Sequence, residues 1–274
     1  MAIVLQTVVK DDLALQKKAW QASRRRVLNF GSPLVAILIW QILDMLHVLN
    51  QSFIPAPTAV AAAMIQDATS GQLWSDLRVS LTRIALGFVI AVVPGILIGL
   101  SSGLFPVVRM FVDPIVSATY SIPKLALAPL FMLVFGLTET EKILLIASGA
   151  IFPVIINTMA GVLDMDKKYM DVAENFGASR FAYYKTVALP GSLPYIFGGL
   201  KMALAESLLL IVAAEMIGAE SGIGYRIWMS YDVMNMPMMF VSFIVIAVLG
   251  HAFSSLLDEA LHWLIPWHRS DIIR

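Results

Sequence analysis

The chain contains six long apolar stretches, most of them carrying one charged residue or none, and these stretches constrain its fold more than any other feature. A helix that crosses the hydrocarbon core of a bilayer needs about 20 apolar residues. Lipid offers the backbone no hydrogen bonds, so such segments must be helical rather than open strands. We therefore predict an all-α, polytopic transmembrane bundle of about six helices, with spans at residues 27–46, 84–108, 114–138, 143–163, 193–217 and 233–257.

Composition leads to the same fold class and excludes several functions. Hydrophobic residues make up 59% of the chain and charged residues only 14%, against about 25% charged in a typical soluble domain. A formal net charge of zero argues against nucleic acid as a partner. The chain has no cysteine, no HExxH metal motif and no GxxxxGK[ST] phosphate loop. We predict no catalytic residue, no metal site and no cofactor bound by this chain.

The distribution of basic residues predicts the topology. Residues 1–26 are basic and precede the first apolar stretch, which is typical of a retained cytoplasmic arm rather than a signal peptide. Residues 27–265 then form a single transmembrane domain, and 266–274 form a cytoplasmic tail. With both termini in the cytoplasm, thirteen Lys and Arg residues lie inside. The four basic residues assigned to outside segments are Arg78, Arg83, Lys142 and Arg226.

The connection at 164–192 is the most polar part of the chain after the N-terminal arm. Its pattern predicts a short helix, a break at Gly177, and a second helix that ends before a proline. Four residues with helical spacing share one face of the first helix, namely Asp171, Glu174, Asn175 and Ala178. Ala173 and Gly177 are small enough for another surface to approach closely. The segment is either a docking site for a soluble partner or a solvated surface helix that contacts nothing.

This segment resembles the EAA loop of ABC importer permeases. That loop has an acidic residue, any residue and Ala, then Gly after three more, and later an aliphatic residue before Leu-Pro. The matching positions here are Asp171, Ala173, Gly177, Val187, Leu189 and Pro190. Asp171 stands for the usual Glu, and Val172 for the first Ala. Residues 54–60, 121–136 and 213–225 are similar to segments of the nitrate, sulfonate, taurine and bicarbonate branch.

The resemblance implies a type I ABC importer permease with the MetI-like fold, located in the inner (plasma) membrane. Two permease copies would pair and sit on two ATPase subunits, which bind ATP and magnesium. A periplasmic or lipid-anchored binding protein would deliver a small, anionic solute. The residues expected to couple this chain to the ATPases are Asp171, Ala173, Glu174, Asn175, Gly177, Ala178, Leu189 and Pro190.

Ionisable residues at membrane depth are functional candidates, because burying a charge in lipid is costly. Lys124 is flanked by two prolines, and it either lies on an anion path or pairs with a carboxylate of a neighbouring helix. Glu206 either lines the path or is held between helices. Glu215 either shapes the outer gate or caps the following turn. The candidate pathway residues are Lys124, Tyr120, Ser121, Glu206 and Glu215, whereas we expect Lys201 to be structural.

Small residues predict where helices touch. Gly95, Gly99 and Gly103 repeat at four-residue spacing, which favours close helix packing over ligand contact. Two other functions fit the sequence less well. A secondary transporter often shows an inverted repeat, and an integral-membrane enzyme needs a catalytic constellation. Neither feature is visible in the sequence.

Overall fold

The computed structural model describes residues 31–265, which divide into two compact units. The first unit extends to Met64 and contains the apolar helix Gly31–Met45 and the first part of α2 (Pro57–Ser70). The second unit begins at Ile65 and contains every described helix that follows α2. The predicted arm at 1–26 and the predicted tail at 266–274 lie outside the described residues.

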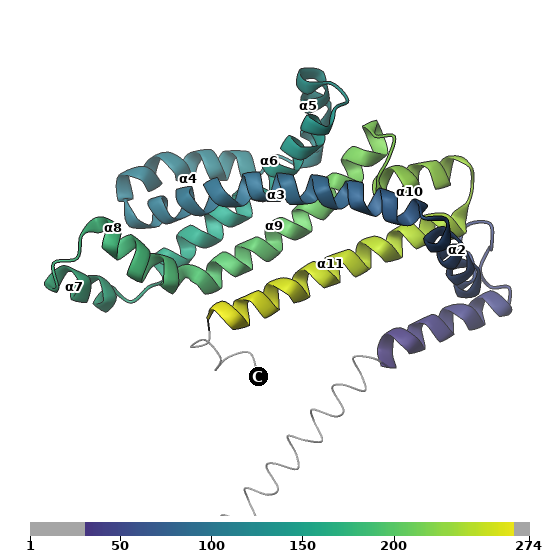
Figure 1. Ribbon diagram of the computed structural model, residues 1–274, viewed down its shortest axis with the longest axis horizontal. Coiled ribbons are helices and arrows are strands. Elements are labelled where there is room, and N and C mark those ends of the chain that lie inside the picture. The colour runs from purple at the N-terminus through teal and green to yellow at the C-terminus, as the bar shows by residue number, and fades with distance from the viewer. Residues whose placement is uncertain (1–30, 266–274) are drawn as a thin grey trace, which may run out of the picture. The chain divides into compact units, whose positions relative to one another are not determined.

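Three long helices form the core of the second unit. They are α3 (Gln72–Leu104), α6 (Glu139–Leu163) and α9 (Leu189–Gly218), and α6 packs along both of the others (Figure 1). Lipid removes most of the hydrophobic drive between helices, so close van der Waals packing between small residues stabilises them instead. Such packing is seen in the buried cluster of Ala91, Ala147, Ala150, Val154 and Ala203.

The glycine stripe of α3 lies against α6. A Cβ atom placed on Gly99 would lie 2.6 Å from Cβ of Thr158 and 2.8 Å from the backbone oxygen of Ile155. At Gly95 the same atom would lie 2.9 Å from Val154. No larger residue fits these positions without moving a helix backbone. The prediction that the four-residue glycine spacing marks close helix packing is confirmed.

The third predicted span is a sharply broken pair of helices. One part is α4 (Pro106–Tyr120), and the other is the 3-10 turn η1 (Lys124–Leu127) followed by α5 (Ala128–Phe135). The two parts are bent by 86° (Figure 1). We predicted one bent helix over 114–138, with Lys124 in its middle. That detail was wrong, because a residue before proline disfavours helical backbone and Pro123 lacks an N–H donor, so the helix ends at Tyr120.

The remaining elements either connect α6 to α9 or pack against α9. Between α6 and α9 lie α7 (Lys167–Asn175), α8 (Arg180–Tyr183) and the π-helical turn η2 (Tyr184–Ala188). After α9, the short α10 (Ile223–Asp232) and the long α11 (Met236–Leu264) both pack against it.

The all-α prediction is confirmed, since every predicted span falls on helix within residues 31–265. In that range four helices are long and apolar enough to cross a membrane, or five if the bent pair is one span. The helix Gly31–Met45 occupies the described part of the first predicted span. The largest boundary error is at α3, which begins at Gln72 rather than at 84, because Asp76 and Arg83 are buried within the helix bundle instead of lying in a loop.

Candidate functional site

The loop between α6 and α9 is a helical hairpin, and polar side chains within it cap the first turns of its two short helices. At its start, the Asp166 carboxylate accepts a hydrogen bond from the Lys168 N–H at 3.0 Å, which caps the first turn of α7. At the start of α8, the Ser179 hydroxyl accepts one from the Ala182 N–H at 3.2 Å. The predicted short helix and the break that follows it are therefore present.

Gly177 closes α7 with a left-handed turn. Its φ is +67°, and the N–H of Ala178 donates to the carbonyl of Ala173 at 2.9 Å. This six-to-one bond is the Schellman ending of a helix, and it needs a residue that adopts positive φ without strain. A Cβ atom at Gly177 would meet nothing within 4 Å. The constraint on Gly177 within the described chain is therefore backbone conformation, while the space outside it is open.

The second half of the hairpin corrects one sequence-based expectation. We predicted a helix that ends before Pro190, but α8 continues through η2 directly into α9. Proline cannot donate to the carbonyl four residues earlier and its ring clashes with that carbonyl in a regular α-helix. The wider π turn just before Leu189 and Pro190 relieves this clash. The hairpin is therefore joined to α9 without a flexible break.

Most of the predicted coupling residues that the structure describes lie on the surface. The side chains of Asp171 and Asn175 are exposed, as are Gly177 and Ala178, whereas Ala173 is half-buried. Leu189 and Pro190 are half-buried where α9 begins. The side chain of Glu174 is outside the described part. A helical face this open suits contact with another molecule.

Sequence reasoning missed an apolar stripe on the same helix. Tyr169, Val172 and Phe176 are 63%, 53% and 86% exposed, and their spacing of three and four residues places them on one face of α7. The sequence alone contains this spacing, but the EAA-like motif is defined by acidic and small residues and does not include the stripe. Exposed apolar side chains on a short polar helix are typical of a protein contact.

A hollow of about 480 Å³ lies where the hairpin meets the two long helices. Asp164 at the end of α6 accepts a hydrogen bond from the Tyr195 hydroxyl of α9 at 2.6 Å. Tyr169 of α7 and Pro190 of α9 line the same hollow. A displacement of the hairpin therefore acts directly on the ends of α6 and α9. We call this end of the bundle the loop end, and the end where α6 begins and α9 finishes the far end.

Lys124 lies at the break after α4, and its ammonium group acts first as a cap for that helix. It donates to the carbonyl of Thr119 and, at 2.9 Å, to that of Ile122. Pro123, four residues after Thr119, has no N–H to donate, so the Thr119 carbonyl accepts from Lys124 and, at 3.1 Å, from the Ile122 N–H. The ammonium also lies 4.6 Å from the ring centre of Phe152 on α6 and 5.9 Å from that of Tyr120. Lys124 is buried, and it forms no ion pair with any described carboxylate.

The other candidate pathway residues divide between two places. Tyr120 is 48% exposed, and its ring centre lies 6.4 Å from that of Phe152. Ser121 is exposed, and its hydroxyl donates to the Ser117 carbonyl at 3.1 Å. Tyr120 and Lys124 both lie against Phe152 of α6, and Glu206 of α9 packs against Gly149 one turn away, so these three residues lie near the middle of α6. Glu215 lies apart from them at the far end.

Glu215 is fully buried, and its carboxylate caps the following helix. It accepts hydrogen bonds from the Gly224 N–H of α10, from the Ser80 hydroxyl of α3, and from Arg83, all at 2.8 to 2.9 Å. Two neighbouring N–H groups are also satisfied by α3, since Gly222 donates to Asp76 and Ile223 donates to Ser80. The N–H groups of Gly222, Ile223 and Gly224, where α10 begins, thus find side-chain partners. Of the two roles considered for Glu215, this geometry matches the cap.

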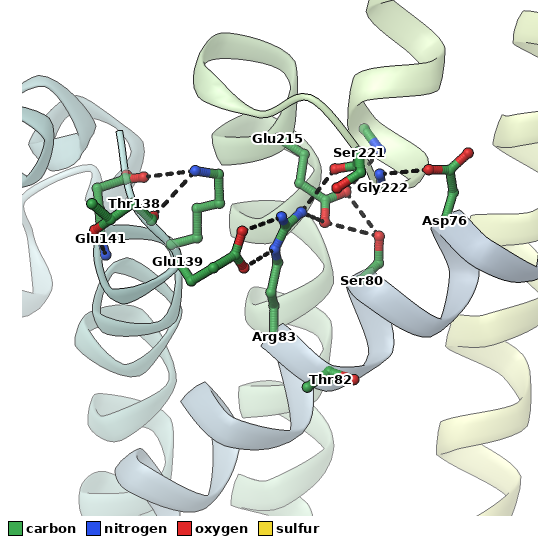
Figure 2. A network of polar contacts seen from close by, with 12 residues as sticks. Asp76, Ser80, Thr82, Arg83, Thr138, Glu139, Glu141, Glu215, Ser221 and Gly222 are labelled. Carbon is green, nitrogen blue, oxygen red and sulfur yellow. Dashed lines mark hydrogen bonds and ion pairs between the residues drawn. The ribbon is translucent and has the colours of Figure 1, made fainter. Parts of the chain in front are cut away.

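Arg83 of α3 contacts α6, α9 and the turn before α10 at the far end (Figure 2). Its guanidinium makes two bonds of 2.6 Å to the Glu139 carboxylate at the start of α6, in the fork geometry that favours arginine. It also donates at 2.8 Å to Glu215 and to the Ser221 carbonyl. We call this cluster of Asp76, Ser80, Arg83, Glu139, Glu215, Ser221 and Gly222 the far-end network.

A second arginine extends this pattern. Arg226 of α10 pairs with Asp76 at 3.0 Å and with Asp67 in the last part of α2. Arg83, Lys142 and Arg226 were assigned to the non-cytoplasmic segments between the predicted spans; the structure has each of them buried within a helix. Lys201 pairs with Asp258 of α11, in keeping with the structural role expected for it. These pairings join residues far apart in sequence, so no local pattern could have found them.

Known proteins with similar sequences are transport proteins. A family model described as "Binding-protein-dependent transport system inner membrane component" matches residues 95–270. The chain is 34% identical to a putative aliphatic sulfonates transport permease protein of Bacillus subtilis (strain 168), over 87% of this chain and 86% of the relative. It is 34% identical to a taurine transport system permease protein of Escherichia coli (strain K12), over 92% and 94%. A nitrate import permease protein of Synechococcus elongatus is 33% identical, over 72% and 74%.

Solved structures agree on the fold. A chain of the MetNI methionine ABC transporter, in an inward-facing conformation, matches with a TM-score of 0.57 at 18% identity. The match covers 70% of this chain and 94% of that one. The predicted MetI-like permease fold is confirmed, and so is the resemblance to the sulfonate, taurine and nitrate branch.

Proposed function

Because the chain belongs to the family of binding-protein-dependent transport system inner membrane components, we propose that it is the permease subunit of an ATP-driven importer. Two copies form the translocation pathway, two ATPase subunits bind ATP and magnesium, and a solute-binding protein delivers the solute. The observation that carries this proposal is the helical hairpin at the loop end, whose first helix has exposed apolar and polar side chains.

The hairpin is suited to transmit force from an ATPase. Its exposed stripe of Tyr169, Val172 and Phe176 offers apolar contact area, and the exposed acidic and small residues beside it complete a surface that a cleft can enclose. The Asp166 side chain caps the first turn of the hairpin, and η2 continues into α9 without a break. Closure of an ATPase pair around α7 therefore moves α6 and α9 together.

The proposal extends to the location and orientation of the chain in the membrane. The relatives and the apolar helices support a multi-pass protein of the inner (plasma) membrane. The excess of basic residues in the arm, the hairpin and the tail supports a cytoplasmic position for these segments. The far-end network then lies toward the side from which the binding protein approaches.

The names of the relatives guide the choice of solute. They are described as permeases for aliphatic sulfonates, taurine and nitrate, each of which carries an anionic group. Lys124 near the middle of the bundle is a cation that such a group could meet. A small solute with an anionic group is therefore the proposed cargo.

Uptake into proteoliposomes tests the proposal. The complete assembly, with its ATPase subunits and binding protein, should accumulate solute only when ATP is supplied on the cytoplasmic side. Gly177→Asp should abolish this uptake, because it places a charged side chain in the open space that the ATPase must approach. Gly71→Asp is the matched control, since Gly71 also has positive φ, +83°, and nothing within 4 Å of its Cβ position.

Three results would contradict the proposal. Uptake that persists without ATP would point to a secondary transporter. A permease that purifies without any ATPase would remove the partner on which the mechanism depends. Equal losses of uptake in the Gly177 and Gly71 variants would show that Gly177→Asp acts through backbone strain. The hairpin would then have no shown role in contacting the ATPase.

A further inference from the structure

The short helix α5 covers the first turns of α6. Ala128, the first residue of α5, lies in a buried cluster with Leu145 of α6 and Ala214 of α9. Phe131, one turn later on α5, packs against the same cluster. On its other side α5 is open, since Leu133 is 82% exposed within the described chain. The helix α5 therefore rests on the bundle by one face, as a lid does.

An ion pair is buried at the start of α6, on the face that α5 covers. Glu141 lies one helical turn before Leu145, so the two side chains share a face of the helix. Glu141 is 0% exposed, although it is only the third residue of α6 (Figure 2). The neighbouring Lys142 is 1% exposed, and its ammonium lies 3.6 Å from the Glu141 carboxylate. This ammonium also donates to the Thr138 carbonyl at 3.2 Å.

The Glu141 carboxylate lacks hydrogen bonds in this arrangement. Neither of its oxygens has a hydrogen-bond partner in the described part of the chain, because 3.6 Å to Lys142 is too long for a hydrogen bond. The equally buried Glu215, by contrast, accepts hydrogen bonds from two side chains and a backbone N–H. Burying a carboxylate without hydrogen bonds is costly. The burial of Glu141 therefore opposes the position in which α5 covers it.

Both ends of α5 are joined to the bundle by breaks in the α-helical backbone. Before α5 lies η1, which follows Pro123 at the 86° break. After α5 lies Gly136, with φ +69° and ψ −175°, a backbone conformation essentially restricted to glycine. A Cβ atom at Gly136 would meet only the Thr138 side chain, at 3.7 Å, so the need for glycine there is conformational. Breaks of this kind at both ends allow a helix to change its angle as one piece.

We propose that α5 is a lid that opens at the far end during transport, and that the buried Glu141–Lys142 ion pair beneath it favours the opening. When α5 lies against α6, its apolar contacts with Leu145 and Ala214 hold the lid shut, and the buried carboxylate opposes them. When α5 moves away, water forms hydrogen bonds with both charged groups, which offsets the lost apolar contact. The two positions of the lid are then close in free energy. This inference rests on the proposed permease function and assigns it a moving part.

Alkylation of a cysteine under α5 measures how often the lid opens. Ala214→Cys places a thiol in the covered cluster, and the chain has no native cysteine. A membrane-impermeant maleimide is added from the far-end side to membrane vesicles that contain the permease–ATPase complex. In this parent, adding Glu141→Leu with Lys142→Met should slow alkylation about tenfold or more, because opening no longer gains hydrogen bonds to charged groups. Adding Gly136→Ala should speed alkylation, because the closed lid needs a backbone conformation that favours glycine.

A purely structural role for the ion pair predicts different results. The variant that lacks both charges should keep or raise the free energy of unfolding, because replacing a buried ion pair with apolar residues of similar size is often neutral or stabilising. Glu220→Gln, which removes an exposed carboxylate in the turn before α10, should leave the alkylation rate unchanged. The lid would be overturned by a parent that is not alkylated, by equal rates with and without the ion pair, or by a lower unfolding free energy without it. Equal slowing by Glu220→Gln, or no faster alkylation of the Gly136→Ala variant, would also overturn it.

Failure of the lid can be distinguished from failure of the proposed function. If the wild-type assembly takes up solute with ATP but the alkylation rate does not depend on the ion pair, only the lid fails. If the wild-type assembly takes up no solute with ATP, the permease proposal itself fails, whatever the alkylation rates are.

Discussion

Arg83→Met would leave Glu215 in the protein interior without its counter-charge. Glu215 has no exposed surface, and Arg83 is 3% exposed, so water cannot replace the lost guanidinium. Glu215 would keep its bonds to Ser80 and Gly224 but lose the ion pair at 2.8 Å. Breaking a buried pair from one side costs about 3–5 kcal/mol. Because two hydrogen bonds to Glu215 remain, we expect a loss near the lower figure, about 3 kcal/mol.

The other carboxylate bound to Arg83 provides an internal comparison. Glu139 has a side chain that is 63% exposed, although its two contacts with Arg83 are the shorter ones at 2.6 Å. Exposed ion pairs contribute about 1 kcal/mol or less because water competes for both groups. Glu139→Gln should therefore cost much less than Arg83→Met, in spite of its shorter bonds.

Denaturant unfolding in detergent micelles, followed by tryptophan fluorescence, measures these differences. In a double-mutant cycle, the variant with both Arg83→Met and Glu215→Gln should lose less unfolding free energy than the two single variants lose together. We expect this difference to exceed about 1 kcal/mol. A cost below about 1 kcal/mol for Arg83→Met, or an equal cost for Glu139→Gln, would refute the reasoning that burial determines the strength of these pairs.

Two further changes test other parts of the structure. Gly99→Ala should destabilise the bundle by about 1–3 kcal/mol in the same unfolding assay, because its Cβ would overlap Thr158, whereas Gly198→Ala, with its nearest neighbour atom at 3.9 Å, should cost little. Equal costs at the two glycines would argue against close α3–α6 packing. Phe176→Ser should leave the unfolding free energy within about 0.5 kcal/mol and weaken binding of the ATPase subunit in a titration. An unchanged affinity would remove the apolar stripe of α7 from the contact.

The spans could be predicted from the sequence because hydropathy is a local property of each stretch. The same is true of the ending of α7, where the glycine spacing and the polar residues around it indicate a short helix followed by a turn. The stripe formed by Tyr169, Val172 and Phe176 was equally predictable, because helical spacing places these residues on one face. The EAA-like motif is defined by acidic and small positions, so it does not include these three residues.

The buried charges could not be predicted in this way. Arg83 and Glu215 are 132 positions apart, and only the packing of α3 against α9 and α10 brings them together. Read locally, Arg83 is a charge at the edge of an apolar stretch, which is why we assigned it to the non-cytoplasmic segment before the predicted span at 84–108. The 86° break at Lys124 has a similar origin. The prolines indicate that the helix stops, but tertiary packing sets the angle and turns the lysine toward the helix end.

Cross-linking from the hairpin tests the central claim most directly. Because the chain has no native cysteine, Phe176→Cys introduces a single reactive site at the loop end, and Leu137→Cys introduces one in the exposed turn before α6 at the far end. With a short thiol-reactive cross-linker in membranes, the cysteine at 176 should join the ATPase subunit, and the one at 137 should not. A cross-link to the ATPase from position 137, or none from position 176, would contradict the assignment of this hairpin as the coupling element.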